Sequence, residues 1–110
     1  MATEVTPENA SAVLYSGTRI VKCHAVWCNP CKKMAPRFDA LVKEYAEDAE
    51  RKNIKFLTLD VDENAALMEE FEIVSVPTLL LVTEGKLKLK FDTLTDVQLY
   101  LDKAVEKGTQ

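Results

Sequence analysis

Three cysteines and the only histidine of the chain lie within nine positions, in the segment VKCHAVWCNPCKK at residues 21–33. Their types and spacing admit three kinds of chemistry. Cys23, His24, Cys28 and Cys31 are all residue types that zinc accepts as ligands. The C-x-x-C pair alone could form a reversible disulfide, and a free cysteine often acts as a small buried hydrophobe. The elements that carry these residues decide among the three hypotheses.

The motif lies where a buried strand is expected to give way to a long helix. Residues 19–26 are rich in β-branched side chains, and apolar residues then recur at helical spacing from about Cys28 to Asp48. Free backbone N–H groups and the macrodipole at a helix N-terminus favour an anion, and a thiolate there can have a pKa of roughly 3.5–7.5 instead of about 8.5. Cys31 follows one helical turn later, close enough to attack a mixed disulfide formed at Cys28.

The zinc hypothesis conflicts with strand geometry. Cys23 and His24 are neighbours on a strand, so their side chains point to opposite faces and cannot both turn towards Cys28 and Cys31. Pro30 stiffens the intervening pair, and no second C-x-x-C exists to complete a tetrahedral site. We therefore expect no metal, and Cys23 is predicted to be buried packing. A purely structural pair stays open as an alternative.

The rest of the chain alternates helix and strand patterns without a linker or repeat. The expected elements are a short helix from Thr6-Pro7-Glu8 to Gly17, a strand at 54–61, a short helix at 63–71, strands at 78–82 and 86–91, and a final helix from 93–95 to 107–108. Glu84-Gly85 is a connection that hairpins favour, so the last two strands should be antiparallel. Leu87, Leu89 and Phe91 alternate with three lysines, which predicts an edge strand with one apolar face.

Composition indicates the class of protein. A chain of 110 residues that is 47% hydrophobic is expected to form a single domain over residues 1–110. The net charge of −4 is spread without blocks, which disfavours nucleic acid and anionic membranes as partners. The N-terminus shows no basic and apolar leader, and the longest apolar stretch, VSVPTLLLV, is too short to span a membrane. A soluble cytoplasmic protein is expected.

Two segments carry a family resemblance. AVWCNPCKKMAP, followed about 45 residues later by VSVPTLLLVTEGK, resembles the thioredoxin family. The resemblance implies an α/β fold with a central mixed β-sheet flanked by helices on both faces, and thiol–disulfide exchange on protein substrates. It also implies that Cys28 is the exposed attacking cysteine, that Cys31 is the buried resolving cysteine, and that Trp27 shields the pair.

The same resemblance implies the surroundings of the pair. Pro77 corresponds to a cis-proline beside the disulfide, and the backbone of Val76 would pair with an extended substrate strand. No bound cofactor is expected. Reducing equivalents would come from a separate NADPH-dependent flavoprotein reductase, and the protein would act as a monomer.

The departures from the family pattern concern the tuning of the pair. Asn29-Pro30 replaces the usual Gly-Pro, and Lys22 stands where the family has a buried aspartate. A Lys22 ammonium, kept charged by Asp60, would favour thiolates; alternatively Lys22 serves as a base when deprotonated, or reaches solvent. His24, on the same strand face, replaces an aromatic residue and either tunes Cys28 or packs.

One further departure affects the docking surface, because Asp92-Thr93 lies where the family has a glycine. Two alternatives to a reductase stay open. One is a net oxidant or isomerase with a raised reduction potential, suggested by Lys22 and Asn29. The other is a binding adaptor with little redox activity.

Overall fold

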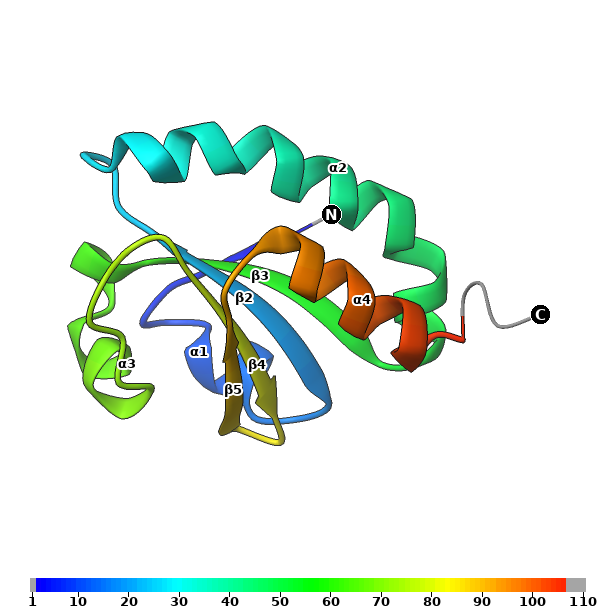
Figure 1. The fold of residues 1–110 in the computed structure, drawn as a ribbon. Helices are drawn as coiled ribbons and strands as arrows, with labels where there is room; N and C mark the ends of the chain where they lie inside the picture. The colour runs from blue at the N-terminus through cyan, green and yellow to red at the C-terminus, as the bar shows by residue number, and fades with distance from the viewer. Residues whose placement is uncertain (1, 107–110) are drawn as a thin grey trace.

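The computed structural model describes residues 2–106 and shows one β-sheet between two layers of helices (Figure 1). The elements are β1 (Thr3–Val5), α1 (Ala10–Leu14), β2 (Thr18–His24), α2 (Asn29–Arg51), β3 (Ile54–Asp60), the 3-10 helix η1 (Val61–Glu63), α3 (Ala65–Glu70), β4 (Thr78–Thr83), β5 (Lys86–Phe91) and α4 (Leu94–Ala104). The predicted mixed sheet flanked by helices on both faces is confirmed. Within the described part of the chain, no helix is long and apolar enough to cross a membrane.

The strand order β1-β3-β2-β4-β5 places β2 at the centre of the sheet. Strands β1 and β2 run parallel to β3, whereas β4 is antiparallel to both β2 and β5. Parallel neighbours need a crossover connection, and α2 supplies it between β2 and β3. The cysteine motif therefore follows the carboxyl end of β2, at the end of the sheet where α2 begins.

Two apolar clusters fill the space between the sheet and its helices. One cluster joins the sheet to α2 and α4, and the other joins it to α1 and α3. Strand β2 contributes alternately to the two: Ile20 lies in the α2 cluster, while Val21 and Cys23 lie in the α1 cluster. Lys22, with the parity of Ile20, therefore lies on the sheet face that α2 covers.

The N-terminal segment differs from the prediction. Residues Thr3–Val5 form β1, a strand that the sequence pattern does not predict. The predicted helix start at Thr6 is instead a turn, in which the Thr6 N–H donates to Asn9 Oδ1 and the Asn9 N–H donates to Thr6 Oγ1. Helix α1 begins only at Ala10, because this turn holds the preceding residues.

The predicted antiparallel hairpin of β4 and β5 is confirmed, but the prediction that β5 has a single apolar face is wrong. Glu84 and Gly85 both have positive φ, 52° and 81°, as a two-residue type I′ turn requires. The register then shifts between Leu81 and Val82, which pair with Leu89 and Leu87. This bulge turns Leu87 towards the α1 cluster while Phe91 packs against the α2 cluster, so the apolar residues of β5 do not share one face.

The final helix begins as expected. Thr93 caps α4, its Oγ1 accepting the Asp96 N–H at 3.1 Å. The regular helix ends at Ala104, and the predicted end at residues 107–108 lies outside the described residues.

Candidate active site

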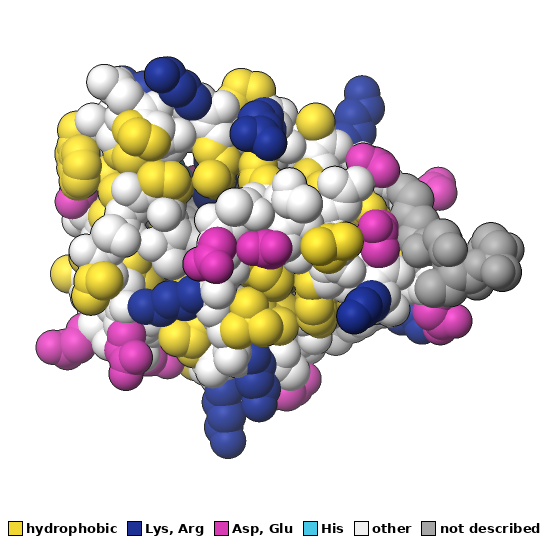
Figure 2. Space-filling view, viewed as in Figure 1, with side chains coloured by type: hydrophobic (Ala, Val, Ile, Leu, Met, Phe, Trp, Pro, Cys, Tyr) yellow, Lys and Arg dark blue, Asp and Glu magenta, His cyan; other side chains and the backbone are white. Residues whose placement is uncertain are grey.

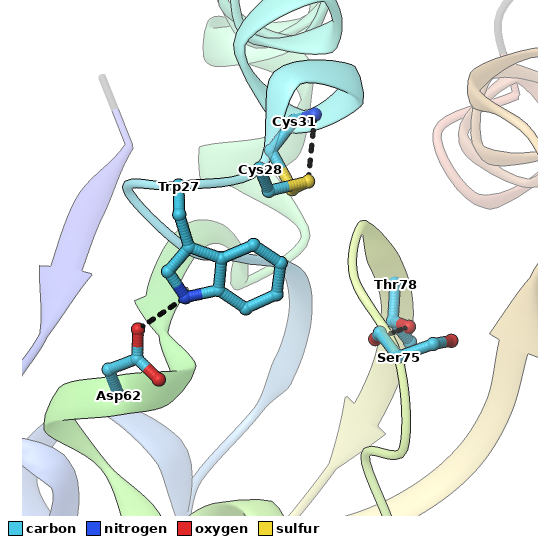
Figure 3. Close-up of a disulfide and its surroundings, with 6 residues drawn as sticks. All are labelled: Trp27, Cys28, Cys31, Asp62, Ser75 and Thr78. Atoms are coloured by element: carbon cyan, nitrogen blue, oxygen red, sulfur yellow. Dashed lines mark hydrogen bonds between the residues drawn. A yellow bond between two sulfur atoms is a disulfide. The ribbon is translucent and has the colours of Figure 1, made fainter.

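A disulfide joins Cys28 and Cys31 at the start of α2 (Figure 3). The two Cα atoms are 5.3 Å apart. Cys28 is the N-cap of the 23-residue helix, and its Sγ accepts the Cys31 N–H at 3.1 Å. The predicted position of Cys28 at the helix N-terminus is confirmed, so the positive end of the helix dipole is directed at its sulfur.

Both sulfur-bearing residues are buried in the disulfide form. Cys28 is 4% exposed and Cys31 is 3% exposed, and both belong to the cluster between the sheet, α1 and α3. The expectation that Cys28 is the exposed member is therefore wrong for this form, because both residues are almost equally buried. Asn29 and Pro30 form the first turn between them, where a proline needs no N–H partner.

Trp27 lies at the surface beside the disulfide. It is 65% exposed, and its Nε1–H donates to Asp62 Oδ2 at 2.9 Å, which ties the indole to η1 (Figure 3). Asp62 is absent from the sequence prediction, because no local pattern connects it with a tryptophan 35 positions earlier. Val26 and Val74 are also exposed, and Figure 2 shows hydrophobic side chains gathered at its left side, where α2 begins.

The peptide bond between Val76 and Pro77 is cis, as the resemblance implies. Figure 3 places the disulfide between Trp27 and the segment that carries Ser75 and Thr78. Val76 packs against the apolar cluster that contains the two cysteines, and it precedes the paired residues of β4, which begin at Thr78.

A groove lies beside Cys31, between the sheet and the first turns of α2. Its polar lining comes from Glu4, Lys22, His24, Thr58 and Lys32. The residues Ala25, Val26, Cys31 and Ala35 complete it. Lys22 and His24 are predicted to lie near the cysteine pair. In the structure both line the groove that Cys31 also lines.

Lys22 does not form the predicted ion pair with Asp60. Among residues 2–106, Lys22 forms no ion pair with a carboxylate, whereas Arg51 pairs with Asp48 and Lys52 with Glu106. In the register of β2 and β3, Lys22 lies opposite Thr58, and Asp60 instead caps η1 by accepting the Asp62 N–H at 2.9 Å. Lys22 is only 6% exposed, with its Nζ 5.5 Å from the centre of the Phe38 ring.

His24 has a carboxylate partner that the sequence prediction lacks. Its Nε2 is 3.4 Å from Oε2 of Glu4. Glu4 stands on β1, the strand that was not expected, and it also accepts the Thr58 hydroxyl and, at 3.2 Å, the Asp60 N–H. No signal short of the strand pairing could have identified it.

Cys23 lies apart from the groove. It is fully buried in the α1 cluster, and burial raises the pKa of its thiol to about 12. The predicted packing role and the opposite placement of Cys23 and His24 are confirmed. Within the described residues, no three His, Cys, Asp or Glu side chains are arranged to hold a metal ion.

Comparisons with known proteins agree with this geometry. The Thioredoxin family model matches residues 2–103. The chain is 37% identical over 83 residues to the thioredoxin of Staphylococcus haemolyticus (strain JCSC1435), which covers 76% of this chain and 75% of that protein. The identity and coverage are the same for the thioredoxin of Staphylococcus saprophyticus subsp. saprophyticus.

A solved structure extends the likeness to the fold. The oxidized form of mitochondrial thioredoxin 3 from Saccharomyces cerevisiae matches with a TM-score of 0.69 and 26% identity, covering 96% of this chain and 93% of that one. The chain therefore belongs to the thioredoxin family, and its redox-active Cys28–Cys31 pair makes it a thiol–disulfide oxidoreductase.

Proposed function

We propose that the protein reduces disulfides of other proteins, with Cys28 as the attacking and Cys31 as the resolving cysteine. The observation that carries this assignment is the position of Cys28 as N-cap of α2, with its sulfur accepting the Cys31 N–H. After reduction, the same N–H and the helix dipole favour a thiolate on Cys28. Cys31 lies inside the first turn of α2, so its sulfur is not at the positive end of the helix dipole.

The reaction proceeds by two displacements. The Cys28 thiolate attacks one sulfur of the substrate disulfide, forms a mixed disulfide and releases the other substrate sulfur as a thiolate. Cys31 then attacks Cys28, which closes the Cys28–Cys31 bond and releases the second substrate thiolate. Two electrons pass from the protein to the substrate, and each released thiolate takes a proton from solvent.

The exposed apolar side chains around the motif support a protein substrate. Val26, Trp27 and Val74 are 68%, 65% and 88% exposed, and side chains of this kind are suited to a partner surface. Beside them, the unpaired backbone of Val76 can bind an extended substrate segment as an added strand.

A separate reductase restores the dithiol, as it generally does for thioredoxins. We infer that this reductase is a flavoprotein that uses NADPH, and that the chain acts as a single-domain monomer in the cytoplasm. The chain itself needs no cofactor for a reaction that takes place between sulfurs.

Turnover tests the proposal. With dithiothreitol as reductant, the protein should accelerate insulin disulfide reduction well above the rate of dithiothreitol alone. With NADPH and a bacterial thioredoxin reductase, NADPH oxidation should require this chain and insulin together. Absence of turnover in both systems would instead support a binding adaptor.

The reduction potential distinguishes a reductase from a net oxidant. Lys22 places a buried ammonium in the groove that contains Cys31, so it should stabilise the ionised dithiol and raise the potential. Lys22→Asp is expected to lower the potential by about 30 mV, equivalent to about 1.4 kcal/mol for two electrons. Redox titration of the tryptophan fluorescence measures it.

The matched control for that substitution is Lys33→Asp, which reverses the same charge on the exposed surface of α2. Solvent screening should keep its effect below roughly 10 mV. Equal potentials for the parent and Lys22→Asp would remove Lys22 from the tuning of the pair, whereas a parent potential far above about −230 mV would favour an oxidant or isomerase.

A further inference from the structure

Three neighbouring strands place polar side chains in one row beneath the start of α2. Glu4 on β1 is in register with Thr58 on β3, which is in register with Lys22 on β2. His24 lies two residues further along β2, on the same face. All four residues line the groove that also contains Cys31.

Resolution of the mixed disulfide requires a proton acceptor near Cys31. The Cys31 side chain is buried, and burial disfavours a thiolate. A nearby group that accepts the proton therefore helps Cys31 to attack. Besides Cys31, the titratable side chains that line the groove are Glu4, Lys22, His24 and Lys32. A protonated lysine cannot accept a proton, whereas a neutral imidazole can, and histidine is the side chain that changes its protonation between pH 5 and 8.

Glu4 holds the imidazole in place. Its Oε1 accepts the Thr58 hydroxyl and its Oε2 accepts the Asp60 N–H, which holds the carboxylate against β3. Its Oε2 is 3.4 Å from His24 Nε2. A carboxylate that orients a histidine is an arrangement suited to general base catalysis.

We propose that His24, oriented by Glu4, accepts the proton of the Cys31 thiol through solvent in the groove. This inference rests on the proposed function of the pair. Neutral His24 takes the proton, the Cys31 thiolate attacks Cys28 of the mixed disulfide, and the Cys28–Cys31 bond forms as the substrate thiolate leaves. Imidazolium then returns the proton to solvent or to the leaving thiolate. Glu4 is a positioning residue, and the Lys22 ammonium stabilises the transient thiolate.

The charged groups around His24 come from four elements. Glu4 approaches from β1, Asp60 lies opposite it on β3, and Lys22 precedes it on β2. Lys32 of α2 lines the same groove.

Stopped-flow reaction of the reduced full chain with dithiobis(nitrobenzoate) separates the two steps. Cys28 releases a first thionitrobenzoate in a bimolecular phase, and Cys31 releases a second in a phase that is independent of reagent concentration. In the parent, the second phase should show a rise between pH 5 and 8 that levels off once the general base is neutral. His24→Phe and His24→Gln should lose this levelled rise and follow only the ionisation of the Cys31 thiol itself, and their second-phase rate at pH 7 should fall about tenfold or more with the first phase unchanged.

Two further variants separate the roles of the charged groups. Glu4→Gln should slow the second phase about threefold or more, whereas Asp60→Asn, which removes a carboxylate of the same sheet face outside the groove, should not. Lys22→Met should slow the second phase but keep the rise between pH 5 and 8.

Other outcomes overturn the inference. A second phase that keeps its rate and pH dependence in both His24 variants would leave His24 as packing. Loss of the rise in Lys22→Met alone would make Lys22 the base. A parent without a first phase would instead contradict the assignment of Cys28, so failure of the proposed function is recognised separately.

Discussion

Replacing Cys31 by serine should turn the protein from a catalyst into a trap for its substrates. The attacking thiolate at the N-cap of α2 is retained, so the mixed disulfide still forms at Cys28. Serine oxygen cannot displace a sulfur at neutral pH, and turnover should fall at least about a thousandfold. Non-reducing electrophoresis and mass spectrometry should show a covalent adduct that dithiothreitol releases.

Cys28→Ser should abolish turnover to a similar extent but without an adduct, because the first displacement no longer occurs. Cys23→Ala is the control, since the Cys23 thiol is fully buried and burial raises its pKa to about 12. Its turnover should stay within about twofold of the parent. Adducts on Cys28→Ser, or normal turnover of Cys31→Ser, would contradict the assigned roles.

Features set by neighbouring residues could be predicted from the sequence. The change from strand to helix at the motif could be predicted because β-branched residues precede Cys28 and apolar residues recur at helical spacing after it. The hairpin at Glu84-Gly85 needs only two positive φ angles in a short connection. In both cases the local preference and the tertiary structure agree, so the prediction was confirmed.

Features set by pairing between distant segments could not be predicted. Strand β1 is three residues long and is defined by its register with β3, which lies more than 50 positions away. Without β1 the sequence gives no sign of Glu4, so the pattern indicates Asp60 as the carboxylate near Lys22. In the structure, Lys22 lines the groove with Glu4 and its Nζ lies over the ring of Phe38.

The bulge in β5 shows the same limit. Alternation of Leu87, Leu89 and Phe91 with lysines predicts one apolar face, but a single shift of register turns Leu87 to the other cluster. A period of two cannot reveal an inserted residue, since the pattern looks regular on both sides of it.

Phe38 of α2 contacts both the sheet and Lys22. Its side chain is fully buried, its ring meets Phe56 edge to face at 6.4 Å between centroids, and Lys22 Nζ lies 5.5 Å from its centre. Phe38→Ala should lower the free energy of unfolding by about 3–5 kcal/mol, from lost apolar burial and the cavity left behind. Urea unfolding followed by circular dichroism measures the loss.

Phe38→Leu separates the ring from the volume it fills. Leucine keeps most of the apolar contact but removes the aromatic face, so the cost should fall to roughly 1–2 kcal/mol, including the contact with the ammonium. Exposed Lys43→Ala on the same helix should change stability by less than about 0.5 kcal/mol. If Phe38→Leu costs as much as Phe38→Ala, the aromatic contacts dominate over filled volume, and Lys22 depends on the ring for its buried position.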